Sequence, residues 1–191
     1  PVPVMDNAVI GIEVEVERAE GTTQSGLPGW YRTSDQSLRN NGYEFLLSRS
    51  FPRAAQYSLA TLFRWFQNCE PKPIFSWRTS IHVHLNMRNE RIDQLMSLLV
   101  LYLLFEESIF DFVGHERRES NFCVPLQETN LSYTISRMLN NNLKLPALLM
   151  EWCKYTALNY RPLLLNDHAG NTDSPFSTMS GGKGTIEFRH L

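Results

Sequence analysis

The segment from Val9 to Arg18 alternates apolar and acidic side chains, and this alternation constrains the fold more than any other feature of the chain. Its period of two places Glu13, Glu15 and Glu17 on one side of a β-strand and β-branched side chains on the other. The apolar side needs a covering layer, so the segment predicts a sheet with one buried face and one acidic face. The acidic face can be a ligand surface or a solvated edge that resists aggregation, and the segment alone leaves both open.

A second alternating segment closes the chain, from Lys183 to Leu191, behind a glycine-rich approach at 180–184. Glu187 and Arg189 share one face of this predicted strand. A carboxylate and a guanidinium on one face can hold a cation and a phosphate side by side. They can equally form an ion pair on a solvated face, so the pattern has two interpretations.

A third alternating segment carries His82 and His84 on one face with Ser80, and Glu44 lies on a further predicted strand from Tyr43 to Ser48. Successive positions on one strand face lie about 7 Å apart, so Glu13 and Glu15 can each serve one of two divalent ions, or one of them can bridge both ions. Oxygen ligands suit Mg²⁺ or Mn²⁺, and a histidine among them favours Mn²⁺. Two such ions can clamp a transferring phosphoryl group with an arginine beside it. His-Val-His can also be structural or part of a zinc site, which would need a third clear ligand.

The remaining pattern predicts an α+β fold, with an antiparallel or mixed sheet that helices cover on one side. Ser50 suits a helix N-cap because Pro52 follows in the first turn. The nearly apolar helix from Arg91 to Phe112 should be the central buried one. Asn41-Gly42 signals a hairpin turn. The other expected elements are strands at 30–31, 75–87 and 158–165, helices at 50–68, 130–139 and 145–157, and loops at 114–125 and 166–183.

The composition is that of an ordinary globular chain. With 191 residues, 42% hydrophobic residues and a net charge of −2, it fits one domain and indicates neither a nucleic-acid nor a membrane partner. Three well-separated cysteines indicate a reducing compartment. The longest apolar run, Leu98 to Phe105, is too short to cross a bilayer, and no signal peptide is recognisable. We therefore expect a cytoplasmic protein.

Six motifs together resemble those of the amidoligase family, within the carboxylate–amine ligase superfamily of glutamine synthetase and γ-glutamylcysteine synthetase. Each motif is short, but the set follows the expected order and spans nearly the whole chain. The motifs are Gly11-Ile-Glu13-Val-Glu15, Asp35-Gln-Ser37, Glu44, Ile81-His82-Val-His84, Lys154-Tyr-Thr-Ala-Leu-Asn159 and Gly184-Thr-Ile-Glu187-Phe-Arg189-His190.

This resemblance implies a mainly antiparallel sheet whose concave face holds ATP and two or more Mg²⁺ (or Mn²⁺) ions, with helices covering the other side. It favours His82 over His84 as a ligand, and it places Asp35 near the site. The metal ligands that it implies are Glu13, Glu15, Glu44, His82 and Glu187. The ATP contacts that it implies are Arg189, which binds phosphate, and Lys154, Asn159 and Lys183.

The resemblance implies an ATP-dependent carboxylate–amine ligase that forms an amide or isopeptide bond through an acyl phosphate. Its partners would be ATP, an amino-acid or peptide carboxylate and an amine, and the superfamily suggests a homo-oligomer. We expect Arg189, Arg78 and Glu187 to act in catalysis, with Arg78 or Arg117 holding the substrate carboxylate. Residues 1–191 would form a single domain, cut short where such proteins commonly continue with helices.

Two other functions stay open at this point. A ligase-like fold can serve as a non-catalytic structural or interaction module, for example in a phage particle, and the protein would then reside in a virion or in the host cytoplasm. A metal-dependent phosphohydrolase would use the same ligands without an acceptor amine. The retained acidic ligands argue against an inert scaffold, and phosphate release without an amide product would identify the hydrolase.

Overall fold

The computed structural model describes residues 9–22, 27–88, 90–140, 152–163 and 184–191. These residues form six strands and four α-helices. The strand pairs of both units below are antiparallel, which confirms the predicted α+β class with an antiparallel sheet. The chain forms two compact units, residues 1–85 with Leu191 and residues 86–190.

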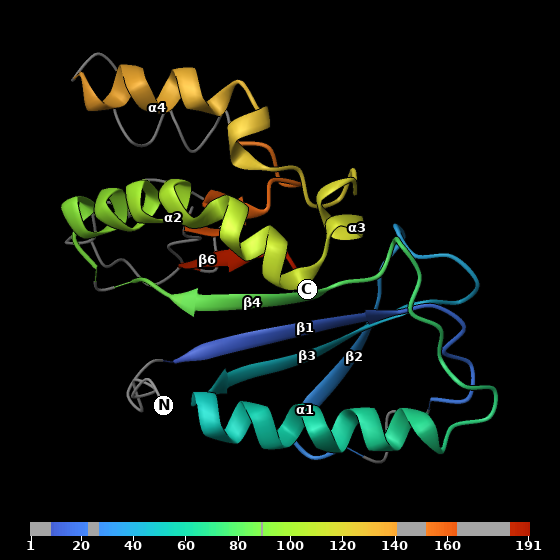
Figure 1. Ribbon diagram of the computed structural model, residues 1–191. Coiled ribbons are helices and arrows are strands. Elements are labelled where there is room, and N and C mark those ends of the chain that lie inside the picture. The colour runs from blue at the N-terminus through green and yellow to red at the C-terminus, as the bar shows by residue number, and fades with distance from the viewer. Residues whose placement is uncertain (1–8, 23–26, 89, 141–151, 164–183) are drawn as a thin grey trace. The chain divides into compact units, whose positions relative to one another are not determined.

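The sheet of the first unit has the strand order β2-β3-β1-β4 (Figure 1). Its register places Glu15 opposite Glu44 and Glu13 opposite His82. Directly opposite residues of an antiparallel pair point to the same face, so these four side chains share one face, as predicted. The strands are β1 (Ile10–Val16), β2 (Trp30–Ser34), β3 (Tyr43–Ser50) and β4 (Ile81–Asn86).

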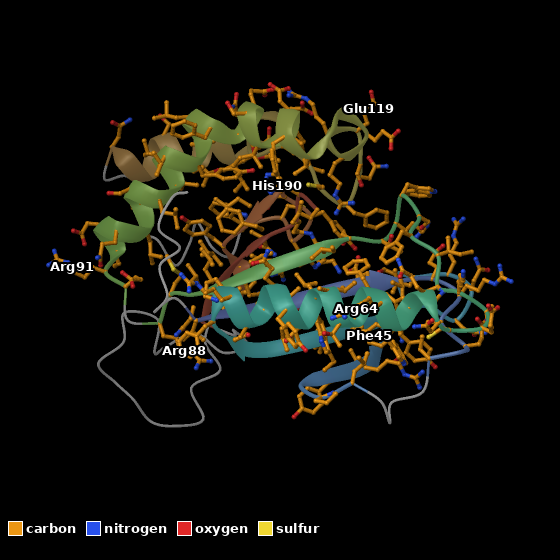
Figure 2. The ribbon with its side chains drawn as sticks, turned by 60° about the horizontal axis from the view of Figure 1, so that its bottom comes forward. Phe45, Arg64, Arg88, Arg91, Glu119 and His190 are labelled. Carbon is orange, nitrogen blue, oxygen red and sulfur yellow. The ribbon has the colours of Figure 1, made fainter. Side chains whose placement is uncertain are left out.

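Helix α1 (Pro52–Gln67) covers the apolar face of this sheet (Figure 1). Leu62 is fully buried, and Phe66 packs edge-on against Phe45 of β3 with 5.0 Å between ring centroids. Burying each side chain of this size contributes about 1.5–3 kcal/mol. Figure 2 shows Phe45 on the sheet and Arg64 on the helix. The carboxylates therefore lie on the face that α1 does not cover.

Helix α1 begins one residue later than the sequence predicts. Ser50 is the last residue of β3, where it pairs with Ile10 of β1. The N-cap is Phe51, with φ −85° and ψ 152° and no side-chain hydrogen bond, and Pro52 starts the helix. The prediction of Ser50 as N-cap is wrong because strand pairing extends through this residue. The fixed φ of Pro52 is enough to start the helix.

The Asn-Gly signal marks a turn, but the loop is longer than a two-residue hairpin. β2 and β3 are neighbouring antiparallel strands, and residues 35–42 connect them. Asn40 and Asn41 have φ values of 52° and 53°, in the left-handed region that asparagine tolerates. At Gly42 a Cβ atom would lie 2.5 Å from Cβ of Leu38 and 2.9 Å from the carbonyl oxygen of Val16. Only glycine fits this close approach.

The second unit contains a short strand pair, three helices and a buried pair of stacked aromatic side chains. The elements are α2 (Ile92–Val113), α3 (His115–Arg118), α4 (Leu131–Leu139), β5 (Leu158–Asn159) and β6 (Thr185–Phe188). Trp152 stacks on Tyr160 with 4.9 Å between ring centroids, and both side chains are buried. The Tyr160 hydroxyl donates to the carbonyl oxygen of Leu95 at 2.8 Å. This hydrogen bond connects the residue after strand β5 to helix α2.

Three predictions for the second unit need correction. The predicted loop at 114–125 contains the short helix α3. The described end of the predicted helix at 145–157, residues 152–157, forms turns and a β-bridge and no helix. The predicted strand at 158–165 is only two residues long, and a 3₁₀ turn at Arg161–Leu163 follows, because Pro162 has no N–H to extend a ladder. Residues 141–151 and 164–183 lie outside the described residues.

Helix α2 is only partly the central buried helix that its sequence predicts. Leu95, Leu99 and Phe110 lie on a buried stripe, whereas Leu104 and Phe105 are 74% and 54% exposed. A helix presents one stripe to a core, so an apolar sequence on all sides cannot be buried by one layer. None of the described helices, α2 included, combines the length and apolar character that crossing a membrane requires.

Candidate active site

The polar face of the first unit places Glu13 between two imidazoles. Its Oε2 lies 3.3 Å from Nδ1 of His82, and its Oε1 lies 3.0 Å from Nε2 of His84. All three side chains are buried, so these contacts act at a lower effective dielectric than in water. The resemblance selected His82 alone. The structure brings both histidines to the carboxylate, because positions 82 and 84 share a strand face.

Ser80 links His82 to the second carboxylate, Glu15. The Ser80 hydroxyl donates to Oε2 of Glu15 and lies 2.5 Å from Nε2 of His82. A serine hydroxyl has one proton, which goes to Glu15, so Nε2 of His82 must donate to Ser80. Nδ1 of His82 then faces the carboxylate of Glu13. A cation shared by this ring nitrogen and the carboxylate oxygen would fit the contact.

A second acidic group forms around Glu15. One carboxylate oxygen each from Glu15, Asp35 and Glu44 lies within 4.8 Å of the others. Glu15 is buried, the other two are half-buried, and the N–H of Ser37 donates to Asp35 at 2.7 Å. Unit charges at this separation repel by about 1 kcal/mol per pair in water and several-fold more at lower dielectric. A cation shared by the three oxygens would offset this repulsion.

Glu17, the third carboxylate of β1's acidic face, has a structural role. Its Oε1 accepts the backbone N–H of Arg39 at 3.1 Å. Its own backbone exchanges two hydrogen bonds with Ile74, at 2.9 and 2.8 Å. Glu17 therefore ties two loops to the end of the strand. This agrees with its position outside the Gly-x-Glu-x-Glu motif.

In the second unit, Glu187 and Arg189 form a buried ion pair at the end of β6. Nη1 of Arg189 lies 2.5 Å from Oε1 of Glu187, and the two side chains are 12% and 6% exposed. Nδ2 of Asn159, opposite Glu187 in the β5–β6 register, donates to Oε2 at 2.8 Å. The ion pair that the sequence left open is therefore formed, but it is buried rather than solvated. Asn159 contacts the carboxylate directly.

The main chain and the guanidinium of Arg189 are both held in place. Its Nε donates to the carbonyl oxygen of Phe122 at 3.2 Å, and its Cζ lies 5.9 Å from the Tyr155 ring centroid. Arg117 donates to the carbonyl oxygen of Arg189 from Nε at 3.2 Å and from Nη2 at 2.7 Å. Arg117, one of two residues expected to hold the substrate carboxylate, is thus engaged with the main chain.

Burial raises the pKa of the nearby Cys123 thiol to about 11, which argues against a nucleophilic role.

His190, the residue after Arg189, joins a buried network beneath α2 (Figure 2). The Tyr102 hydroxyl donates to Oε1 of Glu106 at 2.8 Å and lies 2.8 Å from Nε2 of His190. Glu106 is fully buried and also accepts the N–H groups of Leu126 and Gln127 at 2.6 and 3.0 Å. The Tyr102 proton goes to Glu106, so Nε2 of His190 carries the proton that Tyr102 accepts. The network fixes the chain on the C-terminal side of Arg189.

Burial controls the titration of this network. Burial, with a smaller effect of the Arg117 charge, lowers the pKa of His190 from 6.5 to about 4. Burial and the adjacent Glu106 carboxylate raise the pKa of the Tyr102 hydroxyl above its usual value. His190 is therefore neutral at pH 7, and its role here is that of a hydrogen-bond donor.

The other predicted site residues are placed less directly. Lys154 is exposed in a turn, with Nζ 4.6 Å from the Tyr155 ring centroid. Nη1 of Arg78 donates to the carbonyl oxygen of Ser37 at 3.1 Å, in the loop that carries Asp35. Lys183 lies outside the described residues. Their assignments to nucleotide or substrate stay predictions.

Sequence reasoning missed three residues at these clusters. Ser80 bridges Glu15 and His82, and the shared phase of 80, 82 and 84 was the signal that could have identified it. No local pattern pointed to Tyr155, whose partner Arg189 is 34 residues away. No local pattern pointed to Glu106 either, because it is connected to His190 only through Tyr102. Contacts at such separations depend on the folded chain and not on a local pattern.

The comparison with known families agrees with these motifs. The family model described as "putative amidoligase enzyme" matches residues 71–191, more than half of the chain, and the protein therefore belongs to the amidoligase family. Membership indicates an enzyme that forms amide bonds. The matched range includes Arg78, His82, Glu187 and Arg189, whereas the carboxylates of β1 and β3 precede it. No curated protein and no solved structure matches the chain.

The donor groups of the first unit fit a divalent cation. The three oxygens of the Glu15 group converge from β1, β3 and the loop after β2, within 4.8 Å of one another. Hard oxygen donors of this kind suit Mg²⁺. The contact between Glu13 and His82 adds a mixed oxygen and nitrogen pair, which Mn²⁺ tolerates better.

Proposed function

We propose that this protein is an ATP-dependent carboxylate–amine ligase. The observation that carries the proposal is the convergence of Glu15, Asp35 and Glu44 within 4.8 Å on the face that also presents Glu13 and His82. Membership of the amidoligase family supports amide-bond formation. The clustered carboxylates support the cation dependence that phosphoryl transfer from ATP requires.

Mg²⁺, or Mn²⁺, is the cation of this proposal. Glu15, Asp35 and Glu44 would hold one ion and Glu13 with His82 a second. The resemblance to carboxylate–amine ligases supports Glu187 as a further ligand. When bound, the ions would neutralise phosphate oxygens and orient the γ-phosphoryl group.

Arg189 would supply a fixed positive charge to the phosphoryl group. Its contacts to Glu187 and to the Phe122 carbonyl use two of its five N–H donors and hold the guanidinium in one orientation. A charge that is already oriented stabilises developing negative charge without the cost of reorganisation. Arg117 holds the carbonyl group of Arg189, and the contact of His190 with Tyr102 holds the chain after it.

The proposed reaction has two steps. The substrate carboxylate attacks the γ-phosphorus of ATP, and ADP leaves with formation of an acyl phosphate. An amine then attacks the acyl carbon and loses a proton, inorganic phosphate leaves, and an amide or isopeptide bond remains. In this scheme Lys154 and Lys183 contact the nucleotide. Asn159 contacts the nucleotide directly or orients Glu187 through its hydrogen bond to that carboxylate.

The test is ADP and phosphate formation by the purified chain with Mg²⁺ or Mn²⁺, ATP and a panel of amino acids, acidic peptides and amines, with the amide product detected by mass spectrometry. Glu15→Gln and Asp35→Asn should reduce turnover by at least about 100-fold, the scale of losing one preorganised charge group. Glu20→Gln, which changes an exposed carboxylate of the same unit, is the matched control. Turnover that survives both site variants would refute the site, and phosphate release without amide would indicate a hydrolase.

A second candidate is a non-catalytic interaction module. The observation that favours it is the Glu187–Arg189–Asn159 cluster, whose charges and hydrogen bonds are mutually satisfied in the manner of a structural ion pair. Stable assembly with itself or a partner, without nucleotide binding by isothermal titration calorimetry, would support this candidate over the ligase.

A further inference from the structure

The loop between α1 and β4 presents apolar side chains to solvent. Ile74, Phe75 and Trp77 are 40%, 49% and 60% exposed. The loop itself is well anchored, because Phe75 stacks on Phe63 of α1 with 5.5 Å between ring centroids and Ile74 pairs with Glu17. An exposed aromatic group on an anchored loop loses little conformational entropy when it binds a partner.

Two arginines lie against the ring of Trp77. Cζ of Arg78 is 4.7 Å from the ring centroid, and Cζ of Arg39 is 6.0 Å from it. Arg78 is further held by its hydrogen bond to the carbonyl oxygen of Ser37, whereas Arg39 is exposed. We call the set Arg39, Ile74, Phe75, Trp77 and Arg78 the Trp77 patch. It combines apolar surface with two guanidiniums that suit carboxylate recognition.

The Trp77 patch is connected to the acidic group of the candidate site by hydrogen bonds. Arg78 donates to Ser37, and the N–H of Ser37 donates to Asp35, whose carboxylate lies within 4.8 Å of Glu15 and Glu44. On the β4 side, the backbone N–H of Glu15 donates to the carbonyl oxygen of Ser80, two residues after Arg78. A ligand on the patch would therefore lie next to the proposed metal ligands.

The chemistry and the exposure of the patch indicate the kind of ligand. Small molecules are bound mostly in concave sites that bury most of their surface. A tryptophan that is 60% exposed and flanked by arginines has instead the composition of a protein or peptide contact. The two guanidiniums against the Trp77 ring select a carboxylate.

We propose that the Trp77 patch docks an acidic peptide, which makes a peptide and not a free amino acid the carboxylate substrate of this protein. The assignment of this peptide as substrate rests on the proposed function, but the docking itself does not. Trp77 provides the apolar anchor, and Arg39 and Arg78 bind a peptide carboxylate other than the one that reacts. The reacting carboxylate then extends toward Glu15 and Asp35.

The test is equilibrium binding without ATP, by fluorescence anisotropy of labelled Gly-Glu-Leu-Glu-Tyr-Glu-Leu-Gly. Its counterpart with glutamine in place of each glutamate should bind at least tenfold more weakly. Trp77→Ala and Arg39→Gln should each weaken binding of the acidic peptide at least tenfold. The matched controls Tyr57→Ala and Arg64→Gln change exposed side chains on α1 of the same unit and should alter it less than twofold.

Four results would overturn the inference. The first two are equal binding of the acidic and neutral peptides and unchanged binding in both patch variants. The third is displacement of the peptide by free L-glutamate at an equal carboxylate concentration. The fourth is that binding of ATP or of a thymidine dodecamer depends more strongly on Trp77 and Arg39 than binding of the peptide does. Circular dichroism and thermal melting verify that each variant is folded.

The same experiments separate this inference from the proposed function. Glu15-dependent ATP turnover without peptide binding would refute the patch and leave the ligase intact. Peptide binding that depends on the patch, in a protein without turnover, would support the patch and count against the ligase.

Discussion

The carboxylate charges have different neighbours in the two units. The comparison is between the polar face of the first unit and the cluster around Glu187 in the second unit. In the first unit, Glu15 contacts a hydroxyl and an imidazole and lies within 4.8 Å of two other carboxylates. In the second unit, Glu187 accepts hydrogen bonds from a guanidinium and an amide. The contacts of the second cluster pair opposite charges, whereas those of the first bring like charges together. Under the proposed function, an added cation would stabilise the first cluster and the second would hold a preformed charge.

The largest expected effect tests the cluster around Glu187. Arg189→Ala leaves the buried Glu187 carboxylate without its cationic partner, so the free energy of unfolding should fall by about 3–5 kcal/mol. Urea unfolding measures it, with Arg64→Ala on α1 as a control that should change stability by less than about 0.5 kcal/mol. The double variant Glu187→Gln/Arg189→Met should recover part of the loss. A loss below about 1 kcal/mol for Arg189→Ala would mean that the pair behaves as a solvated one.

The next effect is the pH dependence contributed by His190 in the second unit. Its folded-state pKa of about 4 lies below its ordinary value of 6.5, so the unfolded chain binds more protons between these values. His190 therefore contributes about 3 kcal/mol to the free energy of unfolding above about pH 6.5, and this contribution is lost as the pH falls toward 4. Denaturant unfolding at pH 7 and 4.5 should show a smaller decrease for His190→Gln than for the unchanged protein. Equal decreases would contradict a buried neutral histidine.

Cation binding tests the polar face of the first unit. Mg²⁺ or Mn²⁺ at 100 times its dissociation constant should stabilise the protein by about 2.7 kcal/mol and raise the melting temperature. Glu15→Gln should reduce this shift, because it removes one carboxylate of the group formed by Glu15, Asp35 and Glu44. His82→Gln should reduce the shift for Mn²⁺ more than for Mg²⁺. An undiminished shift in Glu15→Gln would place the cation elsewhere.

The smallest effect has the opposite sign. Asp35→Asn in the cation-free protein removes one of three mutually repelling charges while its side-chain oxygen can still accept the N–H of Ser37. Stability should rise by about 0.5–1 kcal/mol, as expected where function has been favoured over stability. Asp111→Asn, an exposed change on α2, should leave stability within about 0.5 kcal/mol. A loss of stability in Asp35→Asn would show that the acidic group is already compensated.

The candidate site of the first unit could be predicted to a large extent from the sequence. The period-two patterns around Glu13, Glu44 and His82 gave the strand faces, and the register confirms that these side chains share one face. The fold class followed from the order of the elements. The expected ATP, metal, substrate and oligomer assignments stay predictions, as does the single domain.

The elements that differ from the prediction do so for separate local reasons. Pro162 has no N–H to extend the strand predicted at 158–165. The described end of the helix predicted at 145–157 forms turns, and there the indole N–H of Trp152 donates to Thr156 and Leu158. Helix α2 was expected to be wholly buried, but only packing decides which stripe of an apolar helix meets a core. The periodicity of a short apolar segment does not distinguish a helix from a strand or a turn.

The sequence by itself determined the phase of each strand, and with it the face on which each carboxylate and histidine lies, because side-chain direction in a strand depends only on local alternation. Only the tertiary structure decided the partners. It buried the Glu187–Arg189 pair and added Asn159 to it, brought Glu15 to the Ser80 hydroxyl, and engaged Arg117 with a carbonyl oxygen. Burial and contacts between distant residues depend on long-range packing and on which donors remain available once the backbone is satisfied.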